Sequence, residues 1–273
     1  MENKALKIVV LIKHVPDAEF DRHLTGPSHT VDRSTSILSE LDEYPLEAAL
    51  QLVEAHGGAK KAGHQVIAVT MGPDQASAAV KKALQIGAHE GVHLSDEALA
   101  GSDAAATSLA LAAVVKQIGD VDLVMAGMAS TDGETSLVPA QLAERLQLPQ
   151  VTFASELELQ DEGGTYRIRA RRDGDTHSDT IESALPAVVS VTDQINEPRY
   201  PNFKGIMAAK KKPLTTFSLA DIGLETADVG FDGSWTRVES AAARPPRSHG
   251  TIITDEGDAG KQLVDFLEQQ KLV

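Results

Sequence analysis

The first half of the sequence alternates short apolar runs with longer segments of helical periodicity, and this alternation limits the fold more than any other feature. The apolar runs, typical of strands buried on both faces, are 8–12, 65–71, 91–94 and 122–125. Helical spacing of apolar residues follows at 45–56, 73–87, 102–119 and 138–147. Strict alternation predicts a doubly wound α/β fold, in which a mainly parallel, Rossmann-like sheet has helices on both faces.

The pattern changes after Pro149. Segments 152–159 and 166–172 read as strands joined by a turn-rich link, so they predict a β-hairpin extension of the sheet. The stretch 180–191 ends in another buried strand, and a mixed polar segment over 193–213 follows it.

The last part of the chain has a different composition. Residues 225–250 are rich in Gly, Asp, Ser and Pro, and a short helix around Val264 and Leu267 follows them. We therefore expect one domain over residues 1–224 and an extended C-terminal arm over residues 225–273. Because the arm has too few apolar groups to form a core by itself, we expect it to wrap a partner chain.

The composition excludes several classes of function. The net charge of −15 opposes binding to nucleic acid, which relies on neutralising phosphates. The absence of cysteine excludes disulfides, thiolate-bound iron–sulfur clusters and a cysteine nucleophile. The apolar runs are too short for membrane insertion, and the first run does not resemble a signal peptide. We expect a cytoplasmic protein.

One string resembles a metal site. His89, Glu90 and His93 match the zinc-peptidase pattern His-Glu-x-x-His, which needs both histidines on one helical face. Gly91 stands inside the string and residues 92–94 read as a strand, so we expect two ordinary histidines and no metal. The sequence also lacks a dinucleotide-type glycine fingerprint, a P-loop and a serine nucleophile elbow.

The segment 127–138 is a stronger candidate, because it joins the carboxyl end of a predicted strand to a helix, where open α/β sheets bind ligands. It contains no Lys or Arg, so a phosphate there would be held by helix N-terminal N–H groups and nearby hydroxyls. Asp132 could accept hydrogen bonds from ribose hydroxyls. Asp132 or Thr135 could equally cap the helix, and both interpretations stay open.

The lysine run Lys210–Lys212 also has two interpretations. The lysines could complement the dipole of a preceding helix in solvent, which composition alone favours. They could instead surround a docking surface, where Phe203 and Met207 offer apolar contacts and the lysines attract an acidic partner.

Several blocks together resemble a known family. Leu185–Val191, Asn196–Tyr200 and Ile206–Lys212 closely resemble the β subunit of electron transfer flavoprotein. The similarity extends over most of the chain, and its further blocks are Lys7–Lys13, Glu43–Ala48, Val66–Pro73, Asp122–Gly127 and Thr131–Gly133.

The resemblance implies that the chain is one subunit of a heterodimeric electron carrier and that it is not an enzyme. In this family the α subunit holds most of an FAD that carries electrons from dehydrogenases, such as acyl-CoA dehydrogenases, to a membrane quinone oxidoreductase. The β subunit supports the α subunit and, in many members, buries an AMP. This agrees with the absence of a convincing nucleophile or acid–base pair.

The resemblance also places functional residues. The family's AMP contacts fall on Leu11, Ser39, Glu40, Leu41, Asp42, Met71, Gly127, Ser130, Thr131, Asp132, Gly133, Glu134, Thr135, Ser136, Leu137 and Val138. The partner-recognition loop falls on about 191–213, where Phe203 is the protruding anchor with Met207, Lys210, Lys211 and Lys212 around it. An acidic residue that pairs across subunits falls on Asp173, next to Arg172.

The chain departs from the family pattern near the expected AMP. Ser39 and Glu40 stand where members often have Asn-Pro, and Leu137 and Pro139 stand in place of Gln and Gly. Pro139 removes a backbone N–H that could meet a phosphate. Two alternatives therefore remain: a bifurcating-type relative with a second FAD in this subunit, and a stand-alone α/β enzyme or sensor that binds an adenine nucleotide.

Overall fold

The structure is a computed structural model that describes residues 4–26, 28–246, 250 and 252–273. It contains two compact units, one up to Val238 and one from Glu239 onward. The segment 225–238, which the sequence analysis assigned to the arm, belongs to the first unit: the Oγ atom of Ser234 accepts a hydrogen bond from the N–H of Asp103 over 2.9 Å. Residues 247–249 and 251 of the expected arm, and the first three residues of the chain, lie outside the described residues.

The strands of the described residues are β1 Lys7–Leu11, β2 His14–Pro16, β3 Leu24–Thr25, β4 Thr30–Val31, β5 Ser36–Leu38, β6 Gln65–Met71, β7 Glu90–Leu94, β8 Leu123–Gly127, β9 Gln150–Asp161, β10 Tyr166–Asp173, β11 Ser178–Ala184, β12 Ala187–Val191 and β13 Leu214–Phe217. The helices are α1 Glu40–Ala55, α2 Gly58–Ala62, α3 Ser77–Ile86, α4 Ala104–Ile118, α5 Val138–Leu146, α6 Phe203–Ala209, α7 Gly230–Gly233 and α8 Ala259–Gln269. Short 3-10 turns η1 Asp74–Ala76, η2 Glu97–Leu99, η3 Ala220–Ile222 and η4 Thr226–Asp228 join some of them.

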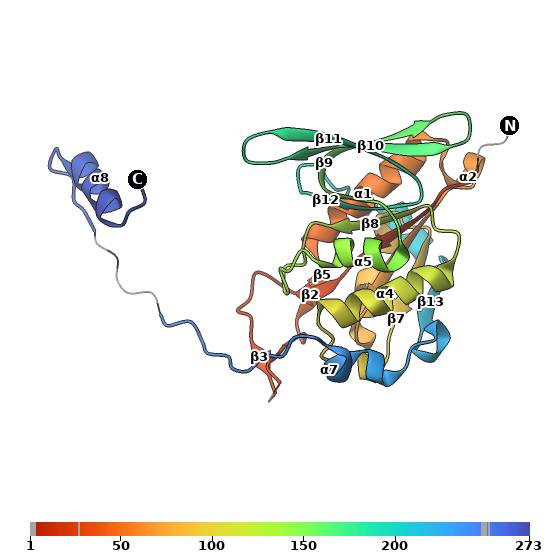
Figure 1. Cartoon of the computed structure of the whole chain (residues 1–273), viewed down its shortest axis with the longest axis horizontal. Coiled ribbons are helices and arrows are strands. Elements are labelled where there is room, and N and C mark those ends of the chain that lie inside the picture. Colours follow the sequence, from red (N-terminus) through yellow and green to blue (C-terminus); the bar gives the residue numbers. More distant parts are fainter. Residues whose placement is uncertain (1–3, 27, 247–249, 251) are drawn as a thin grey trace. The chain divides into compact units, whose positions relative to one another are not determined.

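The described part of the chain contains a nine-stranded sheet with the order β11-β10-β9-β12-β8-β1-β6-β7-β13 (Figure 1). The strands from β9 to β13 in this order pair in parallel. β9, β10 and β11 pair antiparallel and extend the sheet at one edge. The predicted α/β fold with a hairpin extension is therefore confirmed.

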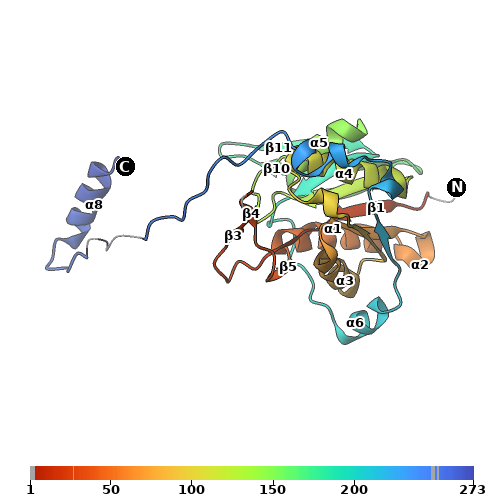
Figure 2. The same cartoon turned by 90° about the horizontal axis from the view of Figure 1, so that it is seen from below.

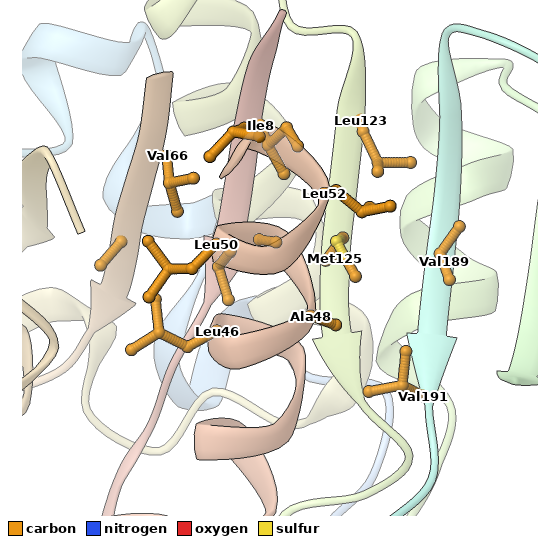
Figure 3. Packing of buried hydrophobic residues seen from close by; sticks show 14 of the residues in the cluster. Ile8, Leu46, Ala48, Leu50, Leu52, Val66, Leu123, Met125, Val189 and Val191 are labelled. Carbon is orange, nitrogen blue, oxygen red and sulfur yellow. The ribbon is translucent and has the colours of Figure 1, made fainter. Parts of the chain in front are cut away.

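The strand β1 shows why the sheet needs helices on both faces. Ile8 and Val10 belong to one apolar cluster, packed with α1 and α3. Figure 3 shows α1 in this cluster, with Leu46 and Leu50 beside the strands. Val9 and Leu11 belong to the other cluster, packed with α4 and α5 on the opposite face (Figure 2). Because alternate side chains of a strand point to opposite faces, a continuous apolar run buries both.

Most elements lie where the sequence predicts them, with two instructive differences. Helix α1 begins at Glu40, before the predicted start at residue 45. The apolar periodicity does not reach this first turn, because the turn carries the acidic residues Glu40, Asp42 and Glu43. Acidic side chains at a helix N-terminus interact favourably with the helix dipole, but they leave no apolar pattern in the sequence. The predicted stretch 180–191 divides into β11 and β12 at Leu185-Pro186.

The sequence analysis gave no bounds for two elements, one inside the expected polar stretch 193–213 and one just after it. Helix α6 buries none of its residues, so it leaves no periodic apolar signal. The edge strand β13 is short and half-exposed, yet it pairs in parallel with β7. The sequence also gave no sign of the short strands β2–β5, which connect β1 to α1.

The second unit contains helix α8, which confirms the short final helix expected around Val264 and Leu267. No residue of α8 is buried, and Leu263, Val264 and Phe266 are each about half exposed. The helix therefore presents an apolar face to solvent.

Candidate functional site

The candidate ligand site lies at the carboxyl ends of β1, β6 and β8, as the sequence predicts for an open α/β sheet. A cavity of about 110 Å³ opens there between the loop after β8 and the first turn of α1. It is lined by Leu11, Ile12, Lys13, Asp42, Val69, Met71, Thr107, Leu111, Ala126, Gly127, Ala129, Ser130, Thr135, Ser136, Leu137, Val138 and Pro139. Nine of these residues were among the candidates named from the sequence.

Gly127 brings the two halves of the predicted site together. A Cβ atom at this position would lie 2.7 Å from the carbonyl oxygen of Leu41 and 3.0 Å from Oδ1 of Asp42. Only glycine allows this approach, because any side chain would push α1 away from the end of β8. The residues Ser39–Asp42 therefore lie beside the segment 127–138.

Asp42 is buried at the floor of the cavity. Its Oδ2 atom accepts a hydrogen bond from the backbone N–H of Lys13 over 2.7 Å. Burial raises the pKa of the Asp42 carboxyl to about 7, although the Lys13 N–H and the Lys13 charge oppose the rise. Asp42 is thus a carboxyl group that changes protonation state near neutral pH.

Asp132 joins three loops through two ion pairs. Its carboxylate contacts Nζ of Lys13 over 2.8 Å and a guanidinium nitrogen of Arg33 over 2.6 Å. Burial alone would raise the pKa of Asp132, but the Lys13 and Arg33 cations outweigh it and hold this pKa far below its usual range. Because Oδ1 also accepts from the N–H of Gly133, the carboxylate fixes the loop instead of standing free for a ribose.

Lys13 and Arg33 are site residues that the sequence analysis missed. Lys13 follows β1 directly, so its place at the carboxyl end of a central strand was a usable signal. Arg33 lies between β4 and β5 in a segment with no clear pattern, and only the tertiary structure brings it to Asp132.

The loop leading into α5 has an unusual backbone. Glu134 and Ser136 adopt left-handed conformations, with φ of 52° and 53°. Such residues at a loop before a helix turn successive N–H groups toward one side, which forms a concavity for anions. Among the described residues no acceptor meets the N–H groups of Thr135 and Ser136. Thr135 accepts from the N–H of Leu137 over 3.5 Å but is not the N-cap of α5, which is Leu137.

A second, larger cavity of about 670 Å³ adjoins the first and shares Lys13, Met71 and Thr107 with it. Its other walls come from the segment around β4 and from the turns after β6 and β7. It has both charge signs, with Lys13 and Arg33 among its lining residues and Asp74, Asp96 and Glu97 among the others.

The predicted partner-binding residues occupy α6 and the turn after it. Phe203 is 79% exposed and Met207 is 47% exposed, while Lys210 and Lys211 are exposed beside them. Lys212 differs, because its Nζ atom donates to the carbonyl oxygens of Leu84 and Ala88 at the end of α3. Lys212 therefore holds α6 to the fold instead of standing at the rim of a docking surface.

The predicted inter-subunit residues have partners within their own hairpin. Asp173 accepts hydrogen bonds from Ser155, Ser178 and Arg171. Arg172 pairs with Asp179 over 3.1 Å. Arg172 and Asp173 therefore do not pair with each other, because each contacts other residues of the β9–β11 sheet edge.

The zinc-like string does not lie on a helix. His93 is a buried residue of β7 whose Nε2 atom lies 3.0 Å from the carbonyl oxygen of Gly72, and His89 accepts from the N–H of Val66. The helical geometry that the peptidase motif needs is therefore not present. Across residues 4–26, 28–246, 250 and 252–273, no group of His, Cys, Asp or Glu side chains is arranged to hold a metal ion.

Comparison with known proteins identifies the family. The family model described as "Electron transfer flavoprotein domain" matches residues 29–222. The chain is 45% identical over 270 residues to the electron transfer flavoprotein subunit beta of Mycobacterium leprae, covering 97% of this chain and 99% of that protein. The chain belongs to the electron transfer flavoprotein beta subunit family. The resemblance stated from the sequence is confirmed.

Two further members of the electron transfer flavoprotein family show its breadth. The subunit beta from Mycobacterium tuberculosis is 43% identical over 268 residues, which cover 97% of this chain and 99% of that protein. CarD, a subunit of the caffeyl-CoA reductase-Etf complex of Acetobacterium woodii, is 35% identical over 272 residues, with 98% and 100% of the two chains covered. Within the described residues, no helix combines the length and apolar character of a membrane span.

The site has the chemistry that an adenine mononucleotide requires. Leu11, Val69, Met71 and Leu111 offer apolar walls for a base, while the 134–136 loop offers N–H groups and hydroxyls for a phosphate. The Oγ atom of Ser39 has no hydrogen-bond partner among the described residues, although Ser39 is fully buried and lines neither cavity. These residues fit a nucleotide.

Proposed function

We propose that this chain is the β subunit of a heterodimeric electron transfer flavoprotein, and that it is an electron carrier subunit without an active site of its own. Dehydrogenases such as acyl-CoA dehydrogenases would reduce an FAD held mainly by the α subunit, and a quinone oxidoreductase would take the electrons on. The flavin supplies the redox chemistry when bound. The protein would act in the cytoplasm.

The observation that carries this proposal is the exposure of Phe203 on α6. Exposed apolar side chains that gather in one place mark interaction surfaces, and large aromatic side chains are typical anchors at interfaces. Met207 adds a flexible apolar contact, and Lys210 and Lys211 would attract an acidic dehydrogenase. We propose that this surface docks the electron donor.

We further propose that AMP spans the smaller cavity and the adjoining part of the larger one, because about 110 Å³ is too little for a whole mononucleotide. Its base would lie against Met71 and Leu11, and its phosphate would meet the N–H groups at Thr135 and Ser136. Asp42 and Ser39 would contact the remaining polar atoms. The proposed contacts also include the family positions Glu40, Leu41, Thr131, Gly133, Glu134, Leu137 and Val138.

Two inter-subunit roles remain proposals. Arg172 and Asp173 would exchange part of their hairpin contacts for groups of the α subunit, and the C-terminal arm would wrap that subunit. The apolar face of α8 supports the second role, because Leu263, Val264 and Phe266 have no cover within the second unit.

Co-expression with a candidate α subunit tests the proposal. We expect a yellow heterodimer with one FAD, and Phe203→Ala should slow flavin reduction by an acyl-CoA dehydrogenase without lowering the FAD content. Trp235→Ala is a matched control, because Trp235 is an exposed aromatic residue at a different place. Unchanged reduction in the Phe203 variant would contradict the docking assignment.

A second candidate function rests on the larger cavity. Its volume of about 670 Å³ and its continuity with the nucleotide cavity would accommodate a second FAD in place of AMP, as in a bifurcating relative. The similarity to CarD supports this candidate. Two FAD per heterodimer, with no AMP released on denaturation, would favour it. A stable monomer that is active with an adenine nucleotide would instead favour a stand-alone enzyme or sensor.

A further inference from the structure

Arg199 makes a polar clamp between the segment before α6 and helix α1. Its guanidinium donates to Glu47 over 2.6 and 3.0 Å and to Glu54 over 2.7 and 2.9 Å. Glu47 and Glu54 are seven residues apart on α1, so they lie on one face of the helix. Planar, two-sided contacts of this kind are the strongest that an ion pair makes.

Burial strengthens this clamp. The Glu47 side chain is only 5% exposed, and it also accepts a hydrogen bond from Gln51. Burial would raise the pKa of Glu47, but its hydrogen bonds with Arg199 and Gln51 hold the pKa below its usual value. Most exposed ion pairs contribute little, whereas removal of one partner here would leave a buried carboxylate unpaired.

Other polar contacts extend the clamp to both ends of α6. Before the helix, Nδ2 of Asn196 donates to the carbonyl oxygen of Tyr44 over 3.0 Å. Within it, Gly205 lies so close to α3 that a Cβ atom would be 2.6 Å from the carbonyl oxygen of Gln85. After it, Lys212 donates to Leu84 and Ala88, so α6 is held beside α3 (Figure 2).

Helix α6 needs these contacts because it has no core of its own. It is seven residues long and buries none of them. A helix this short is not stable alone in water, and the apolar packing of α6 on the core is limited to partly buried residues such as Ala209. The direction of the Phe203 side chain therefore depends on the polar contacts at the two ends of the helix.

We propose that Arg199, through Glu47 and Glu54, is a positioning residue that orients α6 for docking of the electron donor. This inference rests on the proposed function. Arg199 does not itself touch the donor: it fixes the Phe203 surface before the donor arrives, which lowers the entropy cost of binding.

The test measures electron transfer from a medium-chain acyl-CoA dehydrogenase, with octanoyl-CoA, to the FAD-loaded heterodimer. We expect Arg199→Met to raise the KM for the dehydrogenase about tenfold with kcat unchanged, since positioning affects binding and not the chemical step. Arg199→Lys should recover part of the effect, because an ammonium cannot contact both carboxylates in the same planar way. Lys61→Met, which removes an exposed cation from α2, is the control.

Amide hydrogen exchange gives a second readout. Arg199→Met should speed exchange in residues 203–209 about tenfold while α1 and the sheet keep their protection. If Arg199→Met does not fold, Glu54→Gln tests the same clamp, because Glu54 is 55% exposed. Glu54→Gln should raise KM about threefold, less than the tenfold rise for Arg199→Met, because it weakens only the contacts between Arg199 and Glu54.

Two outcomes would overturn the inference: an unchanged KM in the Arg199 and Glu54 variants, or faster exchange throughout α1, which would indicate a general structural role. Phe203→Ala separates this failure from failure of the proposed function. If Phe203→Ala raises KM and Arg199→Met does not, only the positioning role is wrong. If Phe203→Ala leaves KM unchanged, the docking function itself is wrong.

Discussion

Gly127, the last residue of β8, lies directly against the carbonyl oxygen of Leu41 in the first turn of α1. In an α-helix that carbonyl would accept from the residue four positions later, which is Pro45 and has no N–H. The same contact therefore joins two segments of the candidate site and covers a carbonyl group that the helix cannot satisfy.

Gly127→Ala should loosen this junction. Its Cβ would lie 2.7 Å from the Leu41 oxygen, so α1 must shift. We expect the free energy of unfolding to fall by about 1–3 kcal/mol, the usual cost of overpacking, together with loss of the AMP that we propose for this site. Denaturant titration and nucleotide analysis check both effects. Gly133→Ala is a control with more space, since its nearest neighbour would be 3.4 Å away. Equal stability of the two variants would show that the contact is not restrictive.

Asp42 should make stability depend on pH. Its folded pKa of about 7 is above the unfolded value, so its contribution is fully present below about pH 4 and is lost as the pH rises toward 7. Asp42→Asn removes this titration and keeps an acceptor for Lys13. As the pH rises from 4 to 7.5, we expect the free energy of unfolding of the wild-type protein to fall steadily relative to that of Asp42→Asn. A constant difference would mean that Asp42 does not titrate in this range.

Asp132→Asn should weaken the loop that Lys13 and Arg33 hold. These cations are partly exposed, so the expected loss is about 1–2 kcal/mol at pH 7, less than for a fully buried pair. Because the folded pKa of Asp132 is lowered, the stabilisation is present above about pH 4 and is lost as the pH falls through the folded value. Thermal unfolding at pH 7 measures the loss, and Glu134→Gln, which affects an exposed pair, is the control. A loss no larger than that of the control would contradict the role of Asp132.

Ser39→Ala should lower nucleotide retention without lowering the stability of the nucleotide-free protein. The Ser39 Oγ atom is buried without a protein partner among the described residues, so its removal breaks no hydrogen bond within the protein and tests only the proposed contact with AMP. Equilibrium dialysis with AMP should give an affinity about tenfold weaker, the cost of one lost buried hydrogen bond. Thr70→Val is a matched control, since Oγ1 of Thr70 is equally buried and unpartnered there. An equal effect in both variants would remove Ser39 from the proposed site.

The sequence predicts the layered fold well because strands such as β1 and β6 are buried on both faces and leave continuous apolar runs. It also predicts the meeting of Asp42 with the segment after Gly127, although there the family resemblance supplied the residues. It cannot set the bounds of α6, which buries none of its residues, or find Arg33, whose partner Asp132 is far along the chain. Burial leaves a periodic signal in a sequence, whereas ion pairs and carbonyl contacts do not.

The exposed apolar face of α8 has a consequence for synthesis of the protein in the cell. An 11-residue helix is marginal on its own in water, so its order would come with the α subunit that the arm is proposed to wrap. A chain made in excess of that partner would keep Leu263, Val264 and Phe266 accessible to proteases and chaperones. Balanced production of the two subunits would then be enforced by turnover of whichever copies stay unassembled.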